Sequence, residues 1–491
     1  MNPHAIAAVA LLAAGAAFAR EGDLDPRFAG DGQYTVAFDQ SAKKLDQAVR
    51  TLVDKRGRYV MVGYADYARV GLARLLPNGD VDASYAGGGA VDYPIPSNAT
   101  ITDAAIDTID RIVVIGYGLN PLDNDPFVCR YSADGVPDVA VGENGCHFIP
   151  IDYTVNGDGD DRAYAVTNLG DAGGTQKNDL LIAGSVERND AGDFDFAVIR
   201  LTDFDLQPAE AFGGGDGIQT IPFDVSQTHA GGDDDRAYTL VINGIYAYIG
   251  GYAYVGGFAQ SNDFALAKIL VADGTEVATF CPDDGSCGGS FAHTGKRTFS
   301  FGSDDITNGF DERIGAIATQ NGLLVVAGDA LYGSKSDVVV ARLTPNGALM
   351  INPDLTPIHQ RIHIFDETRL GGLTRLGKAD FVAGTTAAAP GSANPLRVLW
   401  AGKLEDAYLQ FATDFVTAGN SSDWLTSFVF PRYDDTQPID QAGGRLCVDR
   451  GRIVLTGSRL WSRDLDSGLD DFDYAIARMQ GDSIFLDGLD Y

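Results

Sequence analysis

Clusters of acidic residues are the clearest candidates for chemistry in this sequence. Asp158, Asp160 and Asp161 follow Asn156, so that oxygen-bearing side chains occupy alternate positions in 156–160. Calcium loops use such alternation, because a hard cation is coordinated by several oxygen atoms. The glycine at the sixth position and the glutamate at the twelfth are missing. Two interpretations stay open: a calcium site at Asp158, Asp160 and Asp161, and, favoured by these mismatches, solvated turn residues. No other cofactor is predicted.

A second set of candidates recurs along the chain. Seven apolar segments carry a basic residue at a late position, and in five of them an aspartate lies five residues earlier. In an extended strand these two positions face opposite sides, so the acid and the base cannot bond within their own strand. We predict structural ion pairs between different strands or neighbouring sheets. The set comprises Arg74, Arg130, Arg200, Lys268, Arg342, Lys403 and Arg478 with Asp125, Asp195, Asp263, Asp337 and Asp473.

Another acidic position recurs at the start of the second strand-like stretch of most repeats. Its members are Asp46, Asp103, Asp161, Asp235, Asp311 and Asp440.

The five cysteines allow disulfides if the chain is exported. Proline and Asp-Gly between Cys281 and Cys287 would fold that segment back on itself, which predicts a disulfide that pins a short insertion. A bond between Cys129 and Cys146 stays an open alternative pairing. Cys447 lies in a strand-like segment and is predicted to be a buried thiol.

No catalytic motif is present: the sequence lacks G-x-S-x-G, H-E-x-x-H and a Walker loop. Acidic residues outnumber basic ones by 68 to 36, for a net charge of -32. Such a charge repels nucleic-acid phosphates and anionic lipid, so neither nucleic acid nor a membrane surface is an expected partner.

The elements that position these residues repeat along the chain. Apolar runs closed by glycine recur at Gly63, Gly116, Gly184, Gly251, Gly328, Gly384 and Gly457. Two strand-like stretches precede each run and one follows it, and Asn-Gly turns at 243–244 and 321–322 indicate hairpins. Four short strands per repeat predict an all-β protein, a seven-bladed β-propeller of four-stranded antiparallel blades.

Several of these segments resemble a known family. Gly22-Asp23-Leu24-Asp25-Pro26-Arg27-Phe28-Ala29-Gly30-Asp31-Gly32, the run ending at Gly63, the strand 263–268 and the segment 341–347 are similar to the delta-60 repeat family of bacterial β-propellers. The resemblance covers nearly the whole chain after residue 19, and is weakest at 349–358 and 397–403. It implies the propeller fold and export, and no particular reaction.

The sequences at the two ends of the chain bear on its domain boundaries and its cellular location. An uncharged apolar run and Ala17-Phe18-Ala19 predict a signal peptide at 1–19, a single propeller domain at 20–481 and a C-terminal tail at 482–491. We therefore expect a secreted, cell-surface or periplasmic protein without membrane insertion.

Two functions follow as hypotheses. The first is an exported, non-catalytic scaffold that binds a protein or glycan partner. The alternative is an extracellular hydrolase or lyase with an acidic, calcium-assisted central pocket. An enzyme of that kind is expected to have a deep axial pocket with convergent acids of perturbed pKa, whereas a scaffold is expected to have a shallow binding surface built from loops.

Overall fold

The computed structural model describes residues 22–38, 46–66, 69–96, 98–151, 153, 159–172, 178–189, 192–223, 234–256, 261–281, 294–301, 311–320, 323–332, 335–352, 357–364, 368–376, 379–388, 396–404, 409, 425–428, 441–463 and 470–480. Residues 1–21 and 481–491, which contain the predicted signal peptide and tail, lie outside this description. No helix in the described part is long and apolar enough to cross a membrane.

Five of the sheets contain four antiparallel strands each, ordered from the centre outward. They are β2 (Gln47–Val53), β3 (Tyr59–Ala65), β4 (Arg69–Leu75) and β5 (Ala90–Pro94); β6 (Thr100–Ile106), β7 (Ile112–Asn120), β8 (Asp123–Tyr131) and β9 (Cys146–Phe148); β10 (Arg162–Asn168), β11 (Leu180–Asn189), β12 (Asp193–Leu201) and β13 (Ile218–Ile221); β22 (Thr368–Leu376), β23 (Ala379–Ala388), β24 (Leu396–Leu404) and β25 (Leu425–Phe428); and β26 (Gln441–Asp449), β27 (Arg452–Arg463), β28 (Asp470–Met479) and β1 (Gln33–Val36). Short 3₁₀ turns lie at Tyr85–Gly87 and Glu143–Gly145.

The remaining strands form one eight-stranded sheet. It contains β14 (Arg236–Asn243), β15 (Tyr246–Gly256), β16 (Ser261–Leu270), β17 (Lys296–Phe299), β18 (Asp311–Gln320), β19 (Leu323–Tyr332), β20 (Lys335–Leu343) and β21 (His359–Ile362). A single parallel bridge between Asn262 and Asp311 joins β16 to β18.

The prediction of seven separate four-stranded blades is therefore wrong. The propeller arrangement contains five four-stranded antiparallel sheets, and the strands between them are continuous as one larger sheet. The physical reason is the backbone pairing of Asn262 with Asp311, which joins strands that the sequence repeat assigned to different blades.

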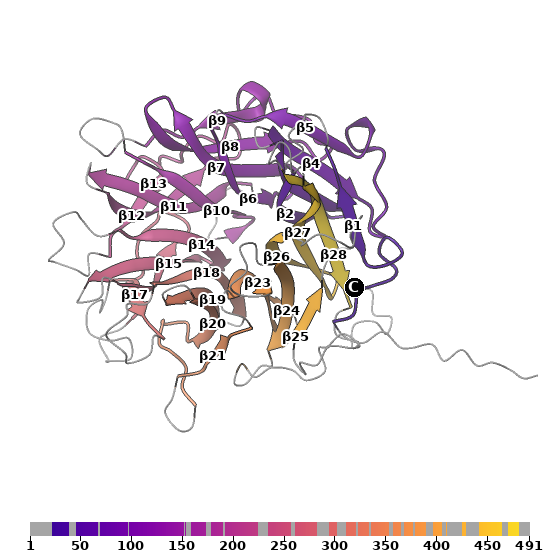
Figure 1. The fold of residues 1–491 in the computed structure, drawn as a ribbon. Coiled ribbons are helices and arrows are strands. Elements are labelled where there is room, and N and C mark those ends of the chain that lie inside the picture. Colours follow the sequence, from indigo (N-terminus) through magenta and orange to yellow (C-terminus); the bar gives the residue numbers. More distant parts are fainter. Residues whose placement is uncertain are drawn as a thin grey trace, which may run out of the picture.

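The predicted grouping of strands also needs correction. The sequence repeat groups Gln33–Val36 with the strand that follows it in the chain, but β1 pairs with β28 from the opposite end of the chain. In each four-stranded sheet, the outermost strand likewise comes from the start of the next sequence repeat. The N-terminal strand thereby closes the ring of sheets (Figure 1).

The innermost strands form the closed centre of the ring (Figure 1). In order, β2 contacts β6, β6 contacts β10, and the contacts continue through β14, β18, β22 and β26 back to β2. Strands such as β12 are buried along nearly their whole length, because a neighbouring sheet packs on each face. One core cluster accordingly combines Val113 and Ile115 of β7 with Ile182 of β11 and Ile199 of β12.

The recurring glycines have a steric explanation. Each innermost strand has a register shift, at one residue between Ala48 and Arg50 of β2 and at the corresponding place in the others. The bulged strand brings its backbone against the glycine of the next strand, and a Cβ on Gly184 would lie 1.9 Å from the carbonyl oxygen of Arg162. Glycine thus recurs because only hydrogen fits there.

Two carboxyl groups, the buried Glu312 and the partly buried Asp263, lie where β16 and β18 meet. Glu312 is 1% exposed and accepts the Phe301 backbone N–H at 3.1 Å. Burial, with a contribution from the charge of Asp263, raises the pKa of Glu312 to about 7, and burial raises the pKa of Asp263 to about 6. The Arg361 charge opposes the shift of Glu312 only in part. The joint between these strands is therefore sensitive to pH.

We expect Glu312→Gln to stabilise the protein above neutral pH. A carboxyl whose pKa is raised on folding binds more protons in the folded than in the unfolded state, so its ionisation destabilises the fold as pH rises from about 5 to 8. Over that pH range, the free energy of unfolding of the variant should rise by on the order of 2 kcal/mol relative to that of the wild type. Thermal unfolding at pH 5, 6, 7 and 8 measures this, with exposed Glu143→Gln as the control. A stability difference that stays constant with pH would contradict it.

Candidate functional site

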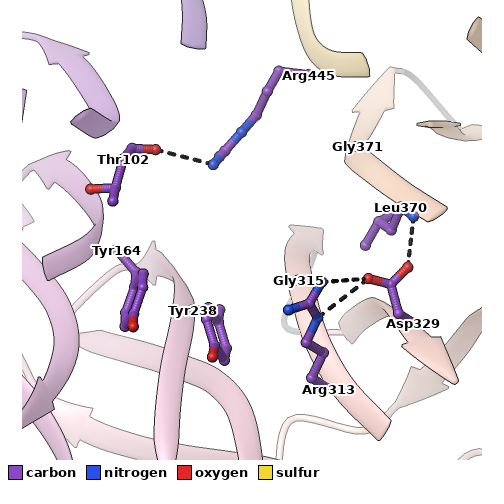
Figure 2. A pocket seen from close by; sticks show the side chains of 9 residues that line it. All are labelled: Thr102, Tyr164, Tyr238, Arg313, Gly315, Asp329, Leu370, Gly371 and Arg445. Carbon is purple, nitrogen blue, oxygen red and sulfur yellow. Dashed lines mark hydrogen bonds and ion pairs between the residues drawn. The ribbon is translucent and has the colours of Figure 1, made fainter. Parts of the chain in front are cut away.

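A cavity of about 320 Å³ lies at the centre of the ring, where the innermost strands converge. Its lining comes from seven strands, and the residues are Thr102, Tyr164, Tyr238, Arg313, Gly315, Asp329, Leu370, Gly371 and Arg445 (Figure 2). We call this space the axial cavity.

The bulges of the innermost strands build the axial cavity. Thr102, Tyr164, Tyr238, Gly315 and Gly371 each occupy the unpaired position of a bulge. A bulge turns the extra residue out of the regular alternation and can direct it to a site. The same irregularity that requires the recurring glycine therefore also presents these residues at the centre.

Tyrosine rings form one wall of the axial cavity. Tyr164 and Tyr238 lie side by side with ring centroids 4.7 Å apart, and Tyr117 and Tyr252 extend the row at 6.0 and 5.9 Å. Burial, with a contribution from Tyr164, raises the pKa of Tyr238. These rings present both an apolar face and a hydroxyl group.

An ion pair forms the opposite side of the cavity. Both Nε and Nη2 of Arg313 donate to one carboxylate oxygen of Asp329, at 3.3 and 3.1 Å, and the other oxygen accepts the Leu370 backbone N–H at 2.7 Å (Figure 2). Burial opposes the charge on Arg313, but Asp329 outweighs burial and raises the pKa of that guanidinium. The Arg313 guanidinium also lies 5.4 Å from the Tyr238 ring centroid.

A second arginine enters the cavity from β26. Arg445 extends toward Thr102 and donates to its carbonyl oxygen at 3.3 Å (Figure 2). It also lies 3.7 Å from Asp103, a carboxylate that Arg50 binds more closely, at 2.8 Å. Burial and the nearby Arg50 charge lower the pKa of Arg445, against the effect of Asp103. Arginine nonetheless stays protonated in proteins.

The described lining of the axial cavity is suited to binding a ligand. Glycosidase chemistry needs two carboxyl groups that flank the bond. Among the residues named as lining the cavity, Asp329 is the one carboxylate, and Arg313 binds it. The described lining therefore presents phenol rings and guanidinium groups to a ligand.

Five residues of the predicted basic set bind carboxylates, and they are buried. The pairs are Arg74 with Asp82 at 2.8 Å, Arg130 with Asp138 at 2.8 Å, Arg200 with Asp179 at 2.7 Å, Arg342 with Asp380 at 2.9 Å and Arg478 with Asp25 at 2.9 Å. The acids differ from those predicted. Lys268 instead lies 4.2 Å from the Tyr246 ring centroid, and Lys403 is buried in β24.

These basic residues also link one repeat to the next. Arg74 donates to the Ala133 carbonyl oxygen at 2.6 Å and Arg200 to that of Ala272 at 2.7 Å, and both bonds join adjacent sheets. Lys268 donates to the Pro345 carbonyl oxygen at 3.3 Å, which joins two parts of the eight-stranded sheet. The basic position therefore recurs because it joins a repeat to the following one.

The predicted aspartates lie elsewhere in the sheets. Asp125 accepts the Ile151 backbone N–H at 3.2 Å and Asp195 lies 3.4 Å from Arg188. Asp337 binds Arg361 and His363, at 3.2 and 2.6 Å. Asp263 and Asp473 lie on β16 and β28. Alternation places these acids on the opposite face from the basic residues, which explains why other aspartates bind the bases.

The acid that recurs at the start of the second strand-like stretch accepts a hydrogen bond from a backbone N–H. In some repeats the acid at this place differs from the predicted residue. Asp46 accepts from the backbone N–H of Phe38 at 2.6 Å, and Asp235 from that of Phe223 at 2.9 Å. Glu312 does the same for Phe301, so it occupies this place and the adjacent Asp311 does not. In its own repeat, Asp103 lies four residues after the place that corresponds to Asp46, and its carboxylate faces Arg50 and Arg445. Asp440 lies outside the described residues.

The predicted calcium ligands are only partly described. Asp158 lies outside the described residues. Asp160 binds Arg162 at 2.7 Å and accepts from the Asn124 amide at 2.8 Å, and buried Asp161 accepts the Glu187 backbone N–H at 2.9 Å. The described part contains no group of three or more potential metal ligands. Because Asp161 is buried, the favoured interpretation as a solvated turn residue is wrong for this residue.

The structure contains the disulfide that the sequence left open. Cys129 of β8 and Cys146 of β9 are bonded directly across the two strands. Cys281 is buried, and Cys287 lies outside the described residues, so their predicted bond stays a prediction. Cys447 is partly buried, and burial raises the pKa of its thiol to about 12.

Sequence reasoning missed the residues of the axial cavity. Arg313 and Arg445 do not recur in every repeat, so a search for repeated chemistry passes over them. One feature of the sequence could have indicated them. At the same position of the repeat, tyrosine stands at 164 and 238, whereas glycine stands at 315 and 371.

Two segments match a known family model. Residues 57–85 and 319–349 match a family described as a domain of unknown function (DUF5122) beta-propeller. Together with the arrangement of the sheets, this match supports a β-propeller family, and the narrower delta-60 resemblance stays a prediction. No curated protein matched in sequence.

Solved structures with similar folds include proteins of several functions. The polysaccharide lyase Uly1 is 9% identical with a TM-score of 0.45, over 89% of this chain and 91% of that one. Drosophila Semaphorin 2a is 9% identical with a TM-score of 0.44, over 95% and 77%. The GH93 alpha-L-arabinofuranosidase of Fusarium graminearum, solved with arabinobiose, is 12% identical with a TM-score of 0.37, over 78% and 95%. Likenesses this distant carry no argument about a ligand.

Proposed function

We propose that this protein is a non-catalytic propeller that binds a glycan in its axial cavity. The observation that carries the proposal is the pair of Tyr164 and Tyr238 rings beside the Arg313–Asp329 ion pair in one cavity. Sugar rings have apolar faces and peripheral hydroxyl groups, and such a wall offers aromatic surface together with hydrogen-bond donors and acceptors.

The cavity is of a size and composition suited to a small part of a glycan. A volume of about 320 Å³ lies at the lower end of ligand pockets, so the cavity would hold a terminal or branching residue of a longer chain. Tyrosines are rigid contact groups that lose little conformational entropy on binding. Export, as predicted from the sequence, would place this cavity where glycans are abundant.

The alternative of an acid-assisted hydrolase has less support. Glycoside hydrolysis by paired acids needs a second carboxyl group near the bond to be broken. The described lining offers one carboxylate, already paired with Arg313. Calcium assistance stays a separate proposal, which calorimetry with Ca²⁺ and a chelator would test at 156–161.

A glycan array with the purified protein tests the proposal. We expect binding to at least one glycan class, and Tyr238→Ala should weaken that binding about tenfold or more, since it removes roughly 1.4 kcal/mol of contact. Tyr238→Phe keeps the ring and should retain most of the affinity.

Phe204→Ala is the matched control, because Phe204 is an aromatic residue that is 80% exposed and does not line the axial cavity. Its binding should equal that of the wild type, and thermal unfolding should show all variants folded. A blank array, unchanged binding by Tyr238→Ala, or release of new reducing ends or unsaturated sugars from a bound glycan would each contradict the proposal.

A further inference from the structure

The charged groups that line the axial cavity or contact its lining do not balance. Arg313 and Asp329 neutralise each other in a close pair. The other two arginines, Arg50 and Arg445, share the single carboxylate of Asp103. These five groups thus carry three positive and two negative charges, in a chain whose net charge is -32.

Arg445 is the arginine with capacity left for a ligand. A guanidinium has five N–H donors. Among the described residues, the guanidinium donates to the Thr102 carbonyl oxygen at 3.3 Å and lies 3.7 Å from Asp103, and both distances are at the long end of their ranges. Its side chain is 35% exposed although it lies inside the ring, so this exposed part faces the axial cavity that it lines.

Asp103 fixes the position of Arg50 next to Arg445. Arg50 binds Asp103 at 2.8 Å, and Asp103 is only 2% exposed and accepts the Val166 backbone N–H at 3.1 Å. The carboxylate is therefore fixed by β10 and cannot turn fully toward Arg445. The acidic surface has little influence here, because salt screens charges beyond about 8–10 Å.

We propose that the glycan bound in the axial cavity is anionic, with a carboxylate or sulfate group that Arg445 binds and the charge of Arg50 supports. The inference rests on the proposed function and narrows its ligand class. The planar fork of a guanidinium matches the paired oxygen atoms of either group. The tyrosine wall would then contact the sugar ring that carries the anion.

Matched glycans test the inference by calorimetric titration. The first pair is a galacturonate hexasaccharide and its methyl ester, and the second is a sulfated carrageenan hexasaccharide and its desulfated form. We expect at least tenfold tighter binding of the charged member in one pair, and that pair identifies carboxylate or sulfate. Binding should weaken with added salt.

Two variants separate ligand binding from a merely structural role. Arg445→Gln should lose about tenfold in affinity for the charged glycan and leave the neutral member unchanged. Asp103→Asn removes the competing carboxylate yet keeps an oxygen for the Val166 N–H, so affinity for the charged glycan should rise several-fold. Exposed Arg56→Gln makes the same charge change outside the cavity and should have no effect.

The possible outcomes distinguish failure of this inference from failure of the proposed glycan binding. Array hits that are all neutral glycans, or equal binding within both matched pairs, overturn the inference and leave glycan binding intact. A blank array together with no binding in either pair overturns the proposed function. Weaker binding of the charged glycan by Asp103→Asn, in a variant that folds as the wild type does, also overturns the inference.

Discussion

Replacing Gly251 by alanine is expected to destabilise the protein by more than about 4 kcal/mol, which is exceptional for one methyl group. A Cβ at this position would lie 1.8 Å from the Arg236 carbonyl oxygen and 2.8 Å from the Ala237 Cα. Both are backbone atoms of the bulged strand β14, so no side-chain rotation can relieve the clash. The strand would have to lose its bulge or separate from β15.

Urea unfolding followed by circular dichroism measures this loss. Gly88→Ala is the matched control, because Gly88 has an extended φ of -163° and a Cβ there would meet no atom within 4 Å. That variant should stay within about 0.5 kcal/mol of the wild type. Should Gly251→Ala unfold at the same urea concentration as Gly88→Ala, the steric account of the recurring glycine would be wrong. The other glycines with equivalent contacts are Gly63, Gly116, Gly184, Gly328 and Gly384.

Replacing Asp25 by alanine is expected to cost about 3–5 kcal/mol, because it leaves a buried arginine without its carboxylate. Asp25 is fully buried and accepts from Arg478 at 2.9 Å, from Arg27 at 3.0 Å and from Gln480 at 2.9 Å. Arg478 is itself only 2% exposed. These contacts hold the N-terminal segment against the end of β28, next to the pairing of β1 that closes the ring.

Asp25 should also make the closure of the ring by β1 and β28 less stable at acidic pH. Burial opposes its ionisation, but the hydrogen bonds from Arg27 and the charge of Arg478 outweigh burial and lower its pKa. A carboxyl with a lowered pKa stabilises the fold above its ordinary pKa, near 4, and this stabilisation is lost as pH falls through the folded value.

Thermal unfolding at pH 7 and limited proteolysis of the N-terminal segment measure the effect of Asp25→Ala. Exposed Asp31→Ala, in the same segment, is the control and should change stability by no more than about 0.5 kcal/mol. A melting temperature equal to that of the control, with no faster cleavage before β1, would show that Asp25 does not hold the ring closed.

Much of the fold could be predicted from the sequence. The glycine-closed runs and the strand-like stretches around them identify antiparallel β-sheets, and the Asn243-Gly244 turn does join β14 to β15. The boundaries between sheets could not be predicted, because a repeat in sequence has no fixed starting point. Pairing of β1 with β28 and the bridge from Asn262 to Asp311 depend on which strands meet in space.

The candidate site was much less predictable. A recurring residue marks what every repeat needs, as Arg200 does when it links two sheets. The axial cavity instead depends on residues that differ between repeats. Tyr238 and Arg445 are more than 200 positions apart in the chain, and no local pattern relates them.

By itself, the sequence determined the type of strand, the recurrence of glycine and basic residues and the acidity of the chain, because these follow from local sterics and composition. Tertiary structure alone decided which aspartate binds which arginine, where the ring closes and which side chains meet at its centre. The physical reason is that a bulge in each innermost strand directs one residue to the axis, and only closure of the ring brings those residues together.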